Sequence, residues 1–221
     1  MSLVCQCPAA TAITSPGNVT CPENFGQIQK VALTRILLAD GTKNKFTGST
    51  GTPAVDNIKL KASWTTKLTA STAEKVVVTP YIYAPADSGG DPRLTSGGND
   101  DLGGVQEVLG GEPIQFTGQL RSIPQDVAAK LRALACEANV GNLGVFLFDE
   151  NGRIEAIQDA TEPTTYYPIP IRGFYVGSKI HGNYDAKDHN VIQWAYPDNY
   201  SDGLVIVTPS DFNPLTDLQN S

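Results

Sequence analysis

The stretch GVFLFDENGRIEAI, residues 144–157, decides the fold class. An apolar run (144–148) and an alternating run (153–157) flank the turn signal Asp149-Glu150-Asn151-Gly152. An Asn-Gly pair between two such runs favours a tight hairpin turn of type I′. The stretch therefore predicts an antiparallel β-hairpin near the centre of the fold.

Similar alternating, β-branched segments lie on both sides of this hairpin. Examples are residues 27–39, 58–64 and 114–120, where apolar and polar positions alternate at the period of a strand. With the other segments of this kind, the sequence predicts about nine strands. We find no repeat of fixed period and no linker that would divide the chain into two cores.

One helix is predicted, at about residues 123–138. Ser122 and Gln125 have the spacing of a capping box, and Pro124 suits the first turn. Cys136, within this helix, is expected to be a small buried residue. The predicted apolar stripe consists of Val127, Leu131, Leu134 and Ala138.

These elements predict a mainly β fold, a β-sandwich or barrel with one flanking α-helix. We expect an extended N-terminal arm at residues 1–24, a single β-rich domain at 25–208 and a polar C-terminal tail at 209–221. The arm and the tail lack the periodicity of core elements.

Residues 85–112 form a long Gly- and Asp-rich loop, which we expect to be mobile in the isolated subunit. Loops of this length in a compact domain are usually functional or disordered. We interpret the loop, the arm and the tail as surfaces that become ordered when they bind a neighbour. The candidate interface glycines are Gly89, Gly90, Gly97, Gly98, Gly103, Gly104, Gly110 and Gly111.

Composition excludes several classes of protein. The chain has 221 residues, 16 basic and 23 acidic, for a net charge of −7, and no long basic block of the kind that neutralises phosphates. No apolar run approaches the roughly 20 residues of a membrane-spanning helix. The start, MSLVCQCP, does not have the pattern of a secretory signal, so we expect synthesis in a cytoplasm and no membrane partner.

His181, Asp185, Asp188 and His189 are the strongest candidates for metal ligands. Two imidazoles and two carboxylates within nine residues have the chemistry of zinc or manganese ligands, and a metal-dependent hydrolase is one possible interpretation. A solvated turn between two strands is the simpler interpretation. We therefore predict no metal, no cofactor, no catalytic residue and no enzymatic activity.

Two other groups of residues leave alternatives open. Cys5, Cys7 and Cys21 have three interpretations: a zinc site, a late disulfide, or free thiols in the arm. Trp64, Trp194 and the eight tyrosines suggest a sugar-stacking surface if they are exposed, and core packing if they are buried. An exposed aromatic face would favour a cell-surface carbohydrate-binding module.

The segments at 21–35, 169–179 and 202–215 resemble virion proteins of phages and prophages of Bacteroides-type gut bacteria. They read CPENFGQIQKVALTR, IPIRGFYVGSK and DGLVIVTPSDFNPL. The order of sandwich, flanking helix, long hairpin loop and extended arm also resembles the phage tail-tube fold. The resemblance is loose in motif, but it spans most of the chain.

The resemblance implies a self-assembling subunit of a ring or tube, located in the virion and made in the bacterial host cytoplasm. Its partners would be copies of itself and other virion proteins, with at most passive contact with DNA. A capsid decoration protein and a neck or connector ring are alternatives within the same class.

Overall fold

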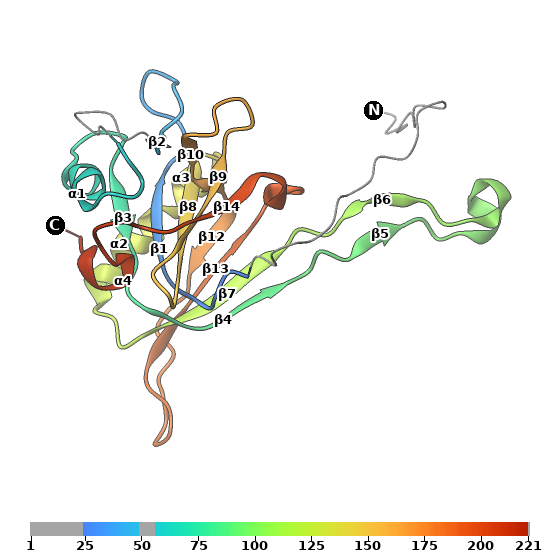
Figure 1. Cartoon of the computed structure of the whole chain (residues 1–221). Coiled ribbons are helices and arrows are strands. Elements are labelled where there is room, and N and C mark those ends of the chain that lie inside the picture. Colours follow the sequence, from blue (N-terminus) through green and yellow to red (C-terminus); the bar gives the residue numbers. More distant parts are fainter. Residues whose placement is uncertain (1–23, 49–55, 221) are drawn as a thin grey trace.

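Two antiparallel sheets form the body of the protein in the computed structural model, which describes residues 24–48 and 56–220 (Figure 1). Eight strands make up the large sheet, in the order β2-β10-β9-β8-β1-β3, with β11 paired to β8 and β14 paired to β9. These strands are β1 (Ile28–Arg35), β2 (Phe46–Thr47), β3 (Val76–Val78), β8 (Leu143–Asp149), β9 (Ile154–Gln158), β10 (Thr165–Tyr167), β11 (Ile169–Pro170) and β14 (Leu204–Val207).

Four strands form the small sheet, in the order β12-β13-β7-β4, and a separate pair, β5-β6, extends from it. The four are β4 (Ile82–Ser88), β7 (Gln115–Arg121), β12 (Arg172–Val176) and β13 (His189–Ala195). The pair consists of β5 (Pro92–Leu94) and β6 (Val108–Gly111). The helices are α1 (Lys61–Thr69), α2 (Gln125–Ala133), α3 (Ala135–Asn139) and α4 (Pro214–Asp217), with 3₁₀ turns η1 (Gly98–Asp100), η2 (Leu102–Gly104) and η3 (Tyr200–Gly203).

The large sheet is buried on both of its faces. One face meets the small sheet, and Val145 and Leu147 share a core with Phe116 and Trp194 there. The opposite face packs against α1 and α4. Every residue of β8 is therefore buried, which explains why residues 143–148 are an unbroken apolar run rather than an alternating one.

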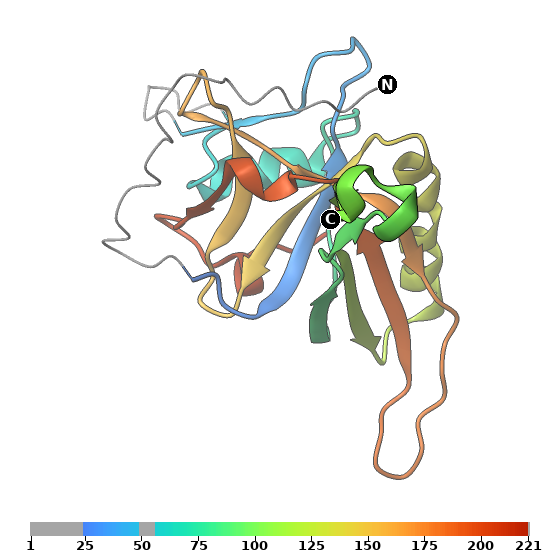
Figure 2. The ribbon, with the colours of Figure 1, turned by 90° about the vertical axis from the view of Figure 1, so that its right-hand side faces the viewer.

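The mainly β sandwich with a flanking helix is confirmed, and Figure 2 shows the two sheets facing each other with α2 and α3 beside β12, the edge strand of the small sheet. The flanking helix is divided at Leu134 into two helices. None of the helices within the described residues has the length and apolar character needed to cross a bilayer.

The predicted hairpin at 144–157 is confirmed, but the predicted type I′ turn is wrong. Asn151 does not adopt the positive φ that a type I′ turn requires, whereas Gly152 does, at 74°. The amide of Gly152 donates to the carbonyl of Asp149, and the Asp149 carboxylate accepts from the amides of Asn151 and Arg153. The side chain of Asp149 thus selects a longer turn than the Asn-Gly pair suggests.

Residues 58–64, predicted as a strand, are a turn at 58–60 followed by the first residues of α1 at 61–64. Trp64 lies on the buried side of this helix, stacked on Phe46 at 4.4 Å, and its Nε1 donates to the carbonyl of Ile58. The first turn receives its cap from a distance, because the amide of Lys61 donates to Asp211. A partner 150 residues away cannot be found from local periodicity.

The predicted capping box at Ser122 is also wrong. Ser122 has a φ of 53°, its amide donates to the carbonyl of Asp188, and Pro124 is the N-cap of α2, without a side-chain cap. The end of the small sheet therefore holds the backbone of Ser122 outside the helix. Cys136 is exposed on α3 rather than buried.

The C-terminal segment folds back on its own chain. Leu215 and Leu218 are buried in the core beneath the large sheet. The Nζ of Lys30 donates to the carbonyl of Leu215 at 2.7 Å, and the Asn220 amide group pairs with both the N–H and the C=O of Val78. Residues 209–220 thus cover the edge of β3, whereas residues 1–23, including the three N-terminal cysteines, lie outside the described residues.

Candidate assembly surfaces

A two-stranded extension of the small sheet is the most prominent surface feature (Figure 1). Strands β4 and β7 run side by side to the pair Ser88–Gln115, and the chain then continues through β5, η1, η2 and β6. We call residues 89–114 the hairpin extension. The glycine-rich loop predicted at 85–112 is therefore a paired hairpin, with backbone hydrogen bonds across it and a turn at its tip.

The paired glycines have a conformational role in this hairpin. Seven of the eight candidates have positive φ, which non-glycine residues adopt only at a cost. Gly89, at the junction with the body, has a φ of 97°, and a Cβ there would lie 2.5 Å from the carbonyl oxygen of Pro113. The glycines let two strands leave the sheet close together, and their role as an interface stays a prediction.

Large apolar side chains are exposed along the extension. Leu102, at the tip, is 97% exposed, Val108 is 70% exposed, and Leu94, Val105 and Leu109 are exposed as well. Single exposed apolar residues are ordinary, but five on one narrow hairpin are unusual, and their burial against a neighbour would be favourable.

The extension also has a strong excess of acid. It has five acidic residues and one basic residue, so it contributes more than half of the net charge of −7. Asp91, Glu107 and Glu112 are exposed. A partner for this surface must therefore offer both apolar contacts and positive charge.

The four candidate metal ligands lie at the loop between β12 and β13, which projects from the body (Figures 1 and 2). His181 Nδ1 lies 3.6 Å from Asp188 Oδ2, and an amide hydrogen bond from Gly182, together with the nearby His181, lowers the pKa of Asp188. Asp188 thus serves to close the loop. In the part of the chain that the structure describes, no three His, Cys, Asp or Glu residues are placed to share a metal ion.

The two tryptophans do not form a surface platform. Trp64 packs in the core beneath the large sheet, and Trp194 stacks on Phe116 at 4.0 Å between the two sheets. Of the tyrosines, Tyr81, Tyr83, Tyr175 and Tyr184 are exposed. Of the two alternatives for Trp64 and Trp194, the structure supports core packing, and only exposed tyrosines are left to support a carbohydrate site.

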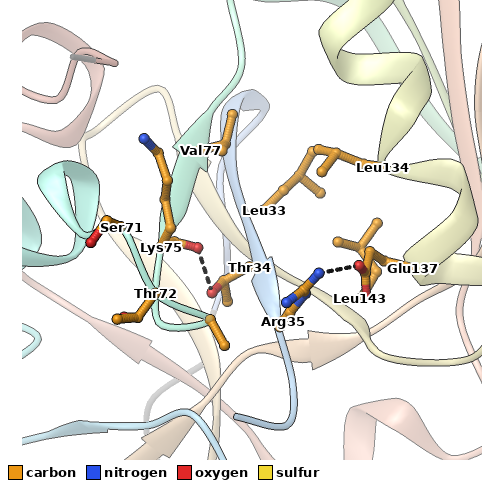
Figure 3. Close-up of a pocket in the computed structure, with 11 residues that line it drawn as sticks. Leu33, Thr34, Arg35, Ser71, Thr72, Lys75, Val77, Leu134, Glu137 and Leu143 are labelled. Atoms are coloured by element: carbon orange, nitrogen blue, oxygen red, sulfur yellow. Dashed lines mark hydrogen bonds and ion pairs between the residues drawn. The ribbon is translucent and has the colours of Figure 1, made fainter. Parts of the chain in front are cut away.

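A cavity of about 340 Å³ opens between β1, the segment before β3, and the helices α2 and α3 (Figure 3). Its apolar wall includes Leu33 and Leu134, and Arg35 and Glu137 form an ion pair beside them. Thr34 donates from Oγ1 to the carbonyl of Lys75. These side chains join β1 to its neighbours, which is a structural role.

A carboxylate between the sheets has an altered pKa. Burial, with Asp87 and Asp149 nearby, raises the pKa of Glu155 in β9 to about 7. Burial also raises the pKa of Asp87, at the base of the hairpin extension. Neither group lies in the cavity described above, so we interpret their altered pKa values as effects on stability.

Comparisons with known proteins identify no family for the chain. It matches no protein-family model and no curated protein. A chain from the tail of an empty gene transfer agent (GTA) particle with C6 symmetry is 11% identical, covering 60% of this chain and 88% of that chain, with a TM-score of 0.29. A chain from the virion of a native GTA particle is 13% identical, covering 57% and 85%, with a TM-score of 0.30. Because these TM-scores are low, the function has to be inferred from the surfaces of this chain.

Proposed function

We propose that this chain is a non-enzymatic structural subunit of a phage-type virion, which assembles with copies of itself through the hairpin extension. The carrying observation is the set of exposed apolar side chains on a hairpin that leaves the body (Figure 1). Ordering a long hairpin costs conformational entropy, and burial against a neighbour offsets that cost.

The class of particle comes from the resemblance of the sequence to phage virion proteins. Within that class, a ring or tube subunit of a tail fits a sandwich body with a projecting hairpin, and other virion proteins would be further partners. A capsid decoration protein and a neck or connector ring are the alternatives. The acidic balance of the chain fits passive rather than adhesive contact with DNA.

The test compares the full chain with an extension-shortened variant. Ser88 and Gln115 are paired in register, so Asn-Gly in place of residues 89–114 closes β4 and β7 with a two-residue turn. We expect the full chain to form rings, tubes or other regular oligomers in sedimentation velocity and electron microscopy as its concentration rises. The shortened variant is expected to stay monomeric.

Two results would contradict the proposal. The full chain could stay monomeric at millimolar concentration, or the shortened variant could assemble as well as the full chain. A glycan-array screen of the full chain separates the carbohydrate-binding alternative, because specific glycan binding that is lost in a Tyr175→Ala/Tyr184→Ala variant would favour it. Both tyrosines are exposed, so this double substitution should leave the fold intact.

A further inference from the structure

Charge is distributed unevenly between two ends of the molecule. Residues 35–80 contain seven basic and three acidic residues, whereas the hairpin extension contains one basic and five acidic residues. Helix α1 and strand β2 of the basic segment lie at the end of the body away from the tip of the extension (Figure 1). The extension therefore cannot reach this basic end of its own chain.

The basic end contains a lysine-lined cavity of about 650 Å³, which we call the lysine hollow. Lys43, Lys45 and Lys67 line it, against the carboxylates of Asp56 and Glu74. Lys67 is buried, and its Nζ donates to Asn44 Oδ1 at 3.0 Å and lies 3.9 Å from Asp56 Oδ1. Three lysines face two carboxylates, so the hollow has an excess of positive charge, and the exposed Lys43 and Lys45 are the lysines that a partner can reach.

The hollow also has an apolar side. Leu38 lines it, and the neighbouring Leu37 is exposed and forms a β-bridge to Lys43. The Nζ of Lys43 lies 5.0 Å from the centre of the Tyr167 ring, which holds the ammonium group at the wall of the hollow. The lysine hollow thus offers positive charge beside an exposed leucine, which is what the acidic and apolar extension requires of a partner.

The matching group on the extension is Glu107. This exposed carboxylate lies in the chain between Val105 and Val108, both of which are exposed, and it follows the tip residue Leu102. Its own amide donates to Thr95 Oγ1, so the backbone that carries it is held across the hairpin. The hollow has the volume of several side chains, which suits these residues rather than a whole domain.

We propose that the lysine hollow is the docking site for the hairpin extension of a second copy of this chain. Glu107 of one copy faces Lys43 and Lys45 of the next, and Leu102 and Val105 pack against Leu37 and Leu38. The inference rests on the proposed function, because it requires that copies associate through the extension. The two surfaces differ, so a docked pair still has one free hollow and one free extension, and the contact can repeat around a ring or along a filament.

The test mixes two variants that are each expected to be monomeric. The extension-shortened variant keeps the hollow, and Lys43→Glu/Lys45→Glu keeps the extension. Head-to-tail docking predicts that the two variants form a one-to-one dimer that grows no further in sedimentation velocity. Adding Lys43→Glu/Lys45→Glu to the extension-shortened variant should abolish this dimer, because neither chain then has a basic hollow.

Charge exchange within one chain gives the second readout. We expect Glu107→Lys alone, and Lys43→Glu/Lys45→Glu alone, to weaken assembly at least tenfold, and the combination of all three to recover most of the loss. Glu112→Lys and Lys59→Glu are matched controls, because both residues are exposed charges outside the proposed contact. Each control should change assembly by less than threefold.

The outcomes separate the inference from the proposed function. If the full chain assembles, but the reversals at Glu107 and at the hollow change assembly no more than the controls, the extension docks elsewhere and this inference is overturned alone. If the full chain stays monomeric and the two variants do not pair, both are overturned. If the hollow reversal abolishes binding of duplex DNA while assembly is unchanged, the hollow is an anion site, and docking there is also overturned.

Discussion

Asp149 shows how one carboxylate determines the central turn. It is fully buried and accepts hydrogen bonds from the amides of Gly26, Asn151 and Arg153 and from the Arg153 side chain. Burial alone would raise the pKa of Asp149, but these hydrogen bonds and the charge of Arg153 lower it overall. The side chain thus joins the turn to the start of β1, a contact that the sequence of the turn does not reveal.

Gly89 permits a test of the backbone at the junction of the extension. Gly89→Ala combines an unfavourable positive φ with a Cβ 2.5 Å from a carbonyl oxygen, which should cost roughly 1–3 kcal/mol locally. We expect faster hydrogen exchange of the amides in residues 89–114 and weaker assembly. Gly111→Ala is the control, because it has open space around it, and equal exchange in the two variants would contradict the prediction.

Glu155 predicts a pH dependence of stability. Its pKa is raised on folding from 4.5 to about 7, by burial first and then by Asp87 and Asp149, so the folded state binds the proton more tightly than the unfolded state. The free energy of unfolding should therefore fall as pH rises from 4.5 to about 7, and stay lowered above that. The contribution of Glu155 is most favourable below its unfolded pKa.

Replacing the carboxylate with a neutral amide tests this sign. We expect Glu155→Gln to melt roughly 2–6 °C above the parent at pH 8 and at the same temperature as the parent at pH 4. Glu112→Gln, at an exposed position, should show no such difference. A Glu155→Gln variant that is less stable than its parent at pH 8 would show that the half-buried carboxylate has a favourable partner.

At the scale of elements, local patterns predicted most strands and the helix at 125–133, because their apolar faces follow one period. They failed at α1 and at residues 209–220, where contacts between residues distant in sequence determine the structure. Asp211 caps α1, and the carbonyl of Leu215 accepts from Lys30. The exposure of Cys136 was missed for the same reason, because the spacing of apolar residues along the sequence does not show which face of α3 other elements cover.

The packing of the C-terminal segment can be measured directly. Leu218 is buried, so Leu218→Ala should lower the free energy of unfolding by about 2–4 kcal/mol. Thr216→Ala, two residues away and exposed, should change it by less than about 0.5 kcal/mol. Urea denaturation of both variants checks this, and similar values would mean that the segment contributes little to the core.

At the scale of the whole molecule, one of the two proposed contact surfaces, the hairpin extension, could be predicted from the sequence, and the other could not. The glycine pairs marked the extension, because glycine is needed wherever φ is positive. The lysine hollow was missed, because Lys43 and Lys45 meet Lys67 only after β2 and α1 have packed together. No spacing in the sequence indicates that convergence.

The body should fold without the extension, since the two cores contain few residues from it. The extension-shortened variant is expected to melt within roughly 4 °C of the full chain, by circular dichroism at a concentration where both are monomeric. A loss of more than about 10 °C would show that the extension supports the body. In that case its absence could not be used to test assembly alone.

The continuity of the extension with the small sheet also has a mechanical consequence. β7 is joined to β13 by seven consecutive residue pairs, and their hydrogen bonds lie across the strand direction. Tension applied at the tip therefore loads these bonds in shear, so that they resist together rather than opening one after another. A particle under internal pressure could transmit force through such a link without unravelling the subunit.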